Sequence, residues 1–334
     1  MGQDWLLLDL DARTKYKMDQ LGDEFFHIGR DVFRMLWVPP PVPPFELKLR
    51  QDLGINTQIR DDRSLMLLPN ELLDLIFVWL AEDWCDLVCF AATCSSLWYI
   101  GITHIHSHFL RLQIESTSRG HRLICLGDKT EANDLPRHLH LTDDEKKQIE
   151  SDGLYTTAHR KFACNSSFSG RGAGLRSSLI AAMNFRMNWD MGILNDVLER
   201  LLPPDARLPA NDNDLVLLNL SKHEFVRGSA LMSRNAILLQ HYKVDGYCEL
   251  PCLGNALLAL ICWSSDPYTG IRYYKPLHRG AWAGDRFSIV PEEAHERERR
   301  DGSGRRWVDI SHKVSLELRE IWIAQRVLVP RRAR

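Results

Sequence analysis

The sequence predicts an α+β protein in which a small module of three helices is inserted into a mixed domain of strands and helices. Three observations predict this fold. Apolar residues recur at helical spacing within residues 64–109. Short apolar runs typical of buried strands flank that block, at 3–10 and 286–290. Parts of the flanking chain resemble each other, which suggests two related α+β units. The expected parts are an N-terminal strand–helix part at 1–44, the helical module at 64–109 and a C-terminal α+β region at 110–329.

Composition places the chain among folded proteins without a strong charge bias. Its 334 residues include 42 Lys and Arg against 44 Asp and Glu, so the formal net charge is −2. This balance argues against general binding to nucleic acid, which needs a basic face. The sequence contains no run of about 20 apolar residues, so we expect no membrane partner. The acidic start of the chain does not resemble a secretory signal. We therefore expect a cytoplasmic or nuclear protein.

The first expected elements are a strand and a helix. Gln3–Leu10 is a short apolar run closed by Asp11, and Leu21–Trp37 places its apolar residues at helical spacing. Five prolines within residues 39–44 end any regular element, because proline lacks the N–H that a helix or a central strand requires. We interpret that segment as a stiff linker, with a polyproline ligand for a partner as the alternative.

Residues 65–109 predict three short helices. Pro69 fits the first turn of a helix, where its missing N–H costs nothing. Asp83 and Asp86 mark the start of a second helix, because acidic residues favour the positive end of the helix dipole. Ser95-Ser96 is a candidate cap for the third. The first helix is apolar on all sides, so we expect a partner to cover one of its faces.

The block carries a series of residues in a characteristic order: Leu68-Pro69, Glu71, Leu72-Leu73, Ile76-Phe77, Leu80, Asp86-Leu87, Cys94 and Leu97-Trp98. By these residues the block resembles an F-box. The resemblance implies docking on the small Skp-type adaptor of a cullin–RING ubiquitin ligase. The residues expected to bind the adaptor are Leu68, Pro69, Leu72, Ile76, Leu80, Leu87 and Trp98. An ordinary three-helix subdomain is the alternative.

The flanks of the block resemble a group of fungal, mushroom-type F-box proteins. The shared pieces are the Met-Gly-Gln start with Trp5, Asn219–Lys222, Cys262–Pro267 and Trp282–Arg286. This second resemblance covers most of the chain. It implies no activity of its own.

An internal similarity relates the two flanks. Leu7–Asp11 resembles Leu217–Ser221, and Arg119–Leu126 resembles Arg279-Gly280 followed by Gly284–Val290. The first copy is longer by about the length of the helical module. We expect strands near Leu7 and Leu217 at equivalent positions, each followed by a turn, a helix and a later strand that begins with arginine. Chance similarity is the alternative.

Several local patterns bear on that arrangement and on chemistry. Ser221–Glu224 has the pattern of a capping box, which predicts the start of a helix. The charged stretch 292–306 balances its signs and predicts a solvated loop. Gly170–Gly174 lacks the lysine of a phosphate-binding loop. Ser264-Ser265-Asp266-Pro267 predicts a turn without the elbow of a serine hydrolase.

The histidines and cysteines do not predict a metal site. His104, His106 and His108 alternate with no completing ligand, and no two cysteines have the CxxC spacing typical of zinc sites. We therefore expect no metal, no cofactor and no catalytic residues. A hydrolase-like enzyme that uses the turn at Ser264, with His278 as its base, is the third-ranked alternative.

Aromatic residues and arginines concentrate in the C-terminal region. Such residues dominate binding hot spots, although they also fill cores. The candidate target-recognition residues are Trp263, Tyr273, Tyr274, Trp282 and Arg286, and a cation–π pair is expected between the last two. The leading hypothesis is a substrate-recruiting subunit of a ubiquitin ligase with an unknown protein target. The alternative is a scaffold whose F-box-like module recruits nothing.

Overall fold

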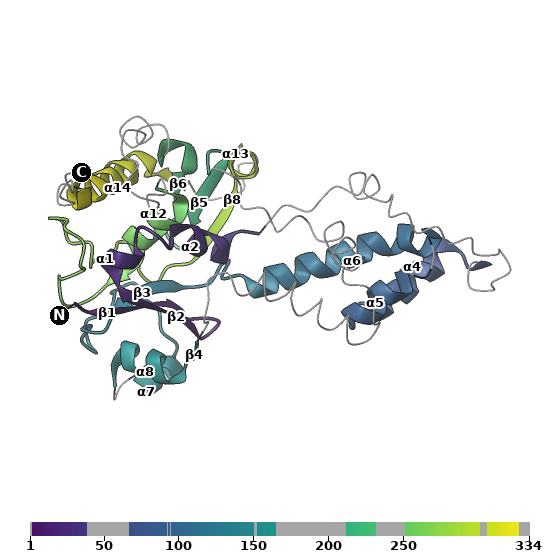
Figure 1. Ribbon diagram of the computed structural model, residues 1–334, viewed down its shortest axis with the longest axis horizontal. Helices are drawn as coiled ribbons and strands as arrows, with labels where there is room; N and C mark the ends of the chain where they lie inside the picture. The colour runs from purple at the N-terminus through teal and green to yellow at the C-terminus, as the bar shows by residue number, and fades with distance from the viewer. Residues whose placement is uncertain are drawn as a thin grey trace, which may run out of the picture. The chain divides into compact units, whose positions relative to one another are not determined.

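The protein is an α+β protein with helices and mixed sheets, as expected. The computed structural model describes residues 2–38, 67–91, 93, 95–149, 152–164, 212–231, 251–300 and 306–326. The chain divides into two compact units (Figure 1). The sheet unit comprises Met1–Trp37, Thr117–Phe168 and Leu208–Arg334, and the helical unit comprises Val38–Ser116 and Ser169–Arg207. The helical unit therefore interrupts the sheet unit in the sequence.

The described part of the helical unit contains three helices: α4 (Asn70–Leu80), α5 (Trp84–Ala91) and α6 (Ser95–Ser116). Pro69 occupies the position before α4. The Asp83 carboxylate accepts the backbone N–H groups of Cys85 and Asp86 at 2.8 and 3.3 Å, and so caps α5. A side chain at Gly101 would lie 2.6 Å from the Phe77 ring, so this glycine lets α4 and α6 approach closely.

The first sheet of the sheet unit has five strands in the order β4-β2-β1-β3-β7. Its strands are β1 (Asp4–Asp9), β2 (Thr14–Gln20), β3 (Leu123–Gly127), β4 (Ala163–Cys164) and β7 (Cys262–Trp263). β1 is the strand expected at Gln3–Leu10, and it pairs antiparallel with both β2 and β3. β4 and β7 add parallel pairs at the two ends. β1 and β3 are buried along almost their whole length, which places the sheet inside the unit.

The second sheet repeats this connectivity. Its order is β8-β5-β6-β9, and its strands are β5 (Leu215–Asn219), β6 (Glu224–Arg227), β8 (Phe287–Pro291) and β9 (Val308–Asp309). β5 pairs antiparallel with β6 and β8, as β1 does with β2 and β3, and β9 runs parallel to β6 as β4 does to β2. The strands at Leu7 and Leu217 therefore occupy equivalent positions.

Two local expectations for these hairpins are wrong. Each first strand is followed by a hairpin partner strand, and not directly by a helix. Ser221–His223 accordingly lies in the β5–β6 turn and Glu224 begins β6, so this segment does not cap a helix. The Asn219 side chain accepts the backbone N–H groups of Ser221 and Lys222, so the same polar residues close a β-turn.

The β1–β2 and β5–β6 hairpins also share the backbone conformation of their turns. Arg13 and His223, four residues after Asp9 and Asn219, are the described non-glycine residues with positive φ, at 52° and 57°. The two sheets also join through reciprocal bonds: Gly120 N–H donates to Phe287 O at 2.6 Å, and Gly284 N–H donates to Leu123 O at 2.8 Å. These paired features relate the two sheets by an approximate two-fold operation.

In each half, the segment that follows a helix pairs with the sheet of the other half. α2 (Gly29–Leu36) ends at Trp37, which bridges to Ile289 in the second sheet. α12 (Leu253–Ile261) leads into β7, which pairs with β3 in the first sheet. The helix expected over Leu21–Trp37 is thus two helices, because α1 (Leu21–Glu24) precedes α2.

The remaining helices cover the sheets. α7 (Asp143–Ile149) and α8 (Gly153–Lys161) lie beside the β1–β2 hairpin, while α13 (Glu292–Arg300) and α14 (Ser311–Arg326) belong to the second half (Figure 1). The solvated loop expected over 292–306 is wrong for its first nine residues, which form α13. Its first turn is acidic, which favours the helix through the macrodipole. None of the helices in the described ranges has the length and apolar character that crossing a membrane requires.

Candidate partner-binding surfaces

The outward side of α4 is apolar. Leu73 and Phe77 point into the helical unit and are 1% and 0% exposed. By contrast, Leu72, Leu75, Val78 and Trp79 are 45%, 54%, 57% and 79% exposed, and Ile76 is half-buried. We call Leu72, Leu75, Ile76, Val78 and Trp79 the α4 outer face. Four of these residues follow the i, i+3, i+4, i+7 spacing of one helix side, so they form a continuous stripe.

The residues expected to bind an adaptor divide between this surface and the interior. Pro69 and Leu72 are exposed, and Leu68, Ile76 and Leu80 are half-buried. Leu87 and Trp98 are buried, so they support the helices from inside. The expectation omitted Leu75, Val78 and Trp79. Leu75 and Trp79 follow Leu72 at i+3 and i+7, the spacing of one helix side, but these positions are not part of the F-box pattern.

A polar contact fixes α4 against α6. The Nε2 atom of His104 lies 2.8 Å from the Asp74 Oδ1 atom, and the His104 ring stacks on Phe77 with centroids 5.3 Å apart. One turn later, the Nδ1 atom of His108 lies 3.0 Å from the Arg111 guanidinium. Burial lowers the pKa of His108, and the neighbouring charge of Arg111 lowers it further. These histidines therefore have roles inside the helical unit.

Two of the aromatic candidates in the sheet unit are held by internal contacts. Trp282 is fully buried, and its indole N–H donates to the Glu224 carboxylate at 2.5 Å. Trp263 is half-buried, and its indole N–H donates to the Asp134 carbonyl at 2.7 Å. The described cation–π contact here is between Arg279 and Trp263, at 4.7 Å, and replaces the expected Trp282–Arg286 pair.

Tyr273 and Tyr274 lie in the stretch between β7 and β8 and contact Glu320 of α14. Both hydroxyls donate to the Glu320 carboxylate at 3.3 Å, and the Lys275 ammonium lies 2.6 Å from the same group. The pKa of Tyr273 is raised by burial and by the charge of Glu317. Tyr274 is 80% exposed and so remains available to a partner. Arg286, the last candidate, is half-exposed and bound to Asp11 at 2.7 Å.

The serine of the C-terminal turn has no described catalytic partner. Ser264 is buried, and its hydroxyl donates to the Gln3 side chain at 2.7 Å. The residue expected as its base, His278, contacts it only through the backbone, where its carbonyl accepts the Ser264 N–H at 3.0 Å. Among the residues that the structure describes, no three His, Cys, Asp or Glu side chains are placed to hold a metal. Gly170–Gly174 and Cys94 lie outside the described residues.

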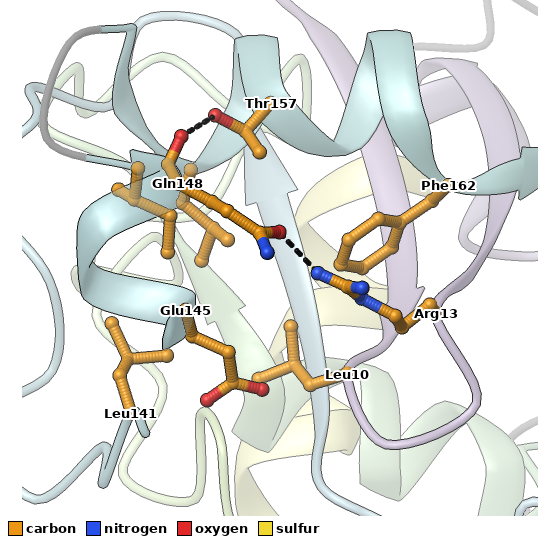
Figure 2. A pocket seen from close by; sticks show the side chains of 9 residues that line it. Leu10, Arg13, Leu141, Glu145, Gln148, Thr157 and Phe162 are labelled. Atoms are coloured by element: carbon orange, nitrogen blue, oxygen red, sulfur yellow. Dashed lines mark hydrogen bonds between the residues drawn. The ribbon is translucent and has the colours of Figure 1, made fainter. Parts of the chain in front are cut away.

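A small pocket opens between the β1–β2 hairpin and the helices α7 and α8. Figure 2 shows Leu10 and Phe162 among its apolar lining, with Arg13 donating to Gln148 across it. Its volume of about 10 Å³ is space for about one water molecule. Glu145 lines one side. Burial raises the pKa of this carboxyl, but the hydrogen bonds from Arg122 and Thr142, together with the charge of Arg122, outweigh burial and lower it. This pocket is too small for a substrate.

No family model matches this chain, and neither do the curated proteins or the solved structures that were compared. Within the described part of the helical unit, the α4 outer face is an exposed apolar surface, and exposed apolar patches are typical of protein-docking elements. Acidic side chains flank it, since Glu71, Asp74 and Glu82 are exposed.

Proposed function

We propose that the helical unit is an F-box, and that the chain recruits a protein target to a cullin–RING ubiquitin ligase in the cytoplasm or nucleus. The α4 outer face carries the proposal, because it exposes large apolar side chains on the helix where the F-box pattern places its adaptor contacts. Leaving such side chains in water is unfavourable by about 25 cal/mol per Å² of apolar surface. A Skp-type adaptor that covers the stripe removes this cost.

The division of labour follows from the two units. The helical unit supplies the docking surface, while Leu87 and Trp98 keep its helices in place from inside. The sheet unit presents the target, and Tyr274 and Arg286 are its candidate contacts because their side chains reach solvent. Ubiquitin transfer belongs to the other subunits, so this function requires no catalytic group in the chain.

The first prediction tests the α4 outer face. The Leu72→Ala/Ile76→Ala variant should bind a purified Skp-type adaptor at least about 30-fold more weakly, a loss of about 2 kcal/mol, because two partly exposed side chains no longer gain burial. The thermal midpoint of the free chain should fall much less, since both side chains already contact water. Titration calorimetry measures the affinity, and a thermal melt measures the stability.

A matched control uses apolar side chains exposed elsewhere. Leu316→Ala/Ile323→Ala removes two partly exposed side chains from α14 and should leave adaptor binding unchanged. A folded Leu72→Ala/Ile76→Ala variant that binds the adaptor as tightly as the wild type would contradict the F-box proposal. Affinity purification then separates the ligase from the scaffold: recovery of cullin together with the adaptor supports the ligase, and recovery of the adaptor alone supports the scaffold.

A further inference from the structure

His295 is the only buried residue among the described side chains of α13. It is 1% exposed, whereas its neighbours on the helix are exposed or half-buried. Its ring packs against Phe225 and Trp307, with centroids 4.7 and 5.1 Å away. Within the described part of the chain, neither of its two ring nitrogens has a hydrogen-bond partner. α13 is therefore anchored to the second sheet by an imidazole in an apolar, aromatic setting.

Two arginine side chains lie near this imidazole. The guanidinium groups of Arg227 and Arg299 lie over the same Phe225 ring, at 4.9 and 5.5 Å from its centroid. Burial lowers the pKa of His295; the charges of Arg299 and Arg227 lower it further, and those of Glu298 and Glu296 act in the opposite direction.

Three carboxylates on the packed elements are bound to Arg227, and Glu298 is exposed on α13. Glu292 lies 2.6 Å from its guanidinium and Glu296 lies 4.0 Å from it, while Asp309 in β9 forms the third ion pair. β5 and β8 contribute the apolar side chains Val216, Leu218 and Val290 to this cluster. The His223 ring also contacts Trp307, with centroids 5.2 Å apart. A protonated His295 thus finds no acceptor among these groups.

We propose that His295 is a pH-sensitive latch, which holds α13 on the second sheet while it is neutral and releases the helix when it is protonated. Release uncovers Phe225 and Trp307, which α13 covers in the docked state. The proposal does not depend on the F-box, because it concerns only the second half of the sheet unit.

The direction of the response follows from proton linkage. The docked state holds a histidine with a lowered pKa, so the undocked state binds more protons. Docking is therefore most favourable above the ordinary histidine pKa of about 6.5, and it weakens as the pH falls below that value. The opening equilibrium of α13 should rise about tenfold for each pH unit below about 6.5, until the pKa of the docked state is reached.

Hydrogen exchange of the full chain measures this opening. After correction for the intrinsic pH dependence of exchange, the amides of α13 should open roughly tenfold more often at pH 5.5 than at pH 7. The amides of β1 should not change by this factor. His295→Gln and His295→Met cannot take up the proton, so both should open equally at the two pH values. His312→Gln on α14 is the matched control and should keep the wild-type response.

Two results would overturn the latch: equal opening of wild-type α13 at both pH values, or a pH response that survives in both His295 variants. If the variants undock α13 already at pH 7, carbon NMR of the wild-type imidazole decides. A titration midpoint well below 6.5 is expected, and a midpoint at about 6.5 would contradict the proposal.

Discussion

At the scale of single residues, one carboxylate joins the two halves of the sheet unit. The backbone N–H of Arg122 donates to Asp11 at 3.0 Å, and its guanidinium binds Asp11 and Glu145. In the second half Ser221 takes the equivalent place and accepts the backbone N–H of Arg286 at 3.0 Å. A serine cannot neutralise a guanidinium, so Arg286 reaches across to Asp11 at 2.7 Å. Asp11 thus serves both arginines.

The Asp11→Asn variant should lower the free energy of unfolding by about 1–3 kcal/mol, because it removes the charge that two partly buried arginines share. Burial raises the pKa of Asp11, but the hydrogen bonds and charge of Arg122, with the charge of Arg286, outweigh it and lower the pKa overall. A lowered pKa gives stability that is present above the ordinary value of about 3.9 and is lost as the pH falls through the folded value.

Urea unfolding at pH 7 and at pH 3 measures this difference. The gap between wild type and Asp11→Asn should narrow at pH 3, and Asp19→Asn, at an exposed position on β2, should match the wild type at pH 7. An equal difference in the free energy of unfolding at both pH values would show that the charge of Asp11 does not stabilise the protein.

At the scale of elements, the packing of α2 on α12 depends on a glycine. A Cβ atom at Gly254 would lie 1.8 Å from the Gly29 carbonyl oxygen, which is far inside van der Waals contact. The backbones of the two helices therefore touch without an intervening side chain. Asn255 reinforces the contact, since its side-chain amide donates to the Phe25 carbonyl at 2.7 Å.

Gly254→Ala should accordingly destabilise the sheet unit by about 1–3 kcal/mol, because the helices must move apart to admit the methyl group. Thermal or denaturant unfolding measures the loss. Gly2→Ala is the matched control, since the added methyl group meets only the flexible Gln20 side chain. A Gly254→Ala variant as stable as the wild type would mean that the two helices can separate at little cost.

The elements also show how far the sequence predicts the structure. The three helices at 70–116 were predictable, because their apolar spacing and the capping residues Pro69 and Asp83 agree. The β5–β6 turn was not, since Ser221–Glu224 fits a helix cap as well as a hairpin turn. α13 was missed because its single inward residue is a histidine, which carries no apolar signal.

For the candidate surfaces, the sequence predicted the exposed face of α4 but not the exposure of the aromatic residues. The sequence indicates that α4 needs a partner, since its apolar residues encircle the helix. It does not indicate which aromatic residues lie at the surface, because aromatic side chains fill cores as well as binding surfaces. The structure separates the two residues Trp282 and Tyr274 by burial. Trp282 is buried and donates to Glu224, whereas Tyr274 is exposed and donates to Glu320 of α14.

At the scale of the whole molecule, Val38–Ser116, the first of the two segments of the helical unit, is an insertion in the sheet unit. The Ser118 N–H donates to the Met35 carbonyl at 2.7 Å, so the chain leaves and rejoins the sheet unit at neighbouring points. By the two-fold relation, the insertion occupies the place that the shorter stretch 264–283 has in the second half. A connection of this kind tolerates large changes in length, because loop-closure entropy grows slowly with length.

Replacing Val38–Ser116 by a short Gly-Ser linker should therefore leave the sheet unit folded, with a cooperative thermal transition, and should abolish adaptor binding. Circular dichroism and a melt check the fold, and calorimetry with the adaptor checks the binding. A matched control replaces 269–276, which removes the Tyr273–Glu320 contact and should keep adaptor binding. A sheet unit that fails to fold without Val38–Ser116 would contradict this modular description.

The exchange of α2 and α12 between the two sheets has a consequence for synthesis on the ribosome. The first sheet is complete only when Cys262-Trp263 has emerged to pair with β3, long after β1 and β2 have left the exit tunnel. During that interval β3 has an unpaired edge, and such edges invite pairing with other nascent chains. Among the described elements, the helices of residues 70–116 contact one another, and such local contacts form early in folding. A translating cell therefore carries a chain whose helices at 70–116 can form while its first sheet is still incomplete.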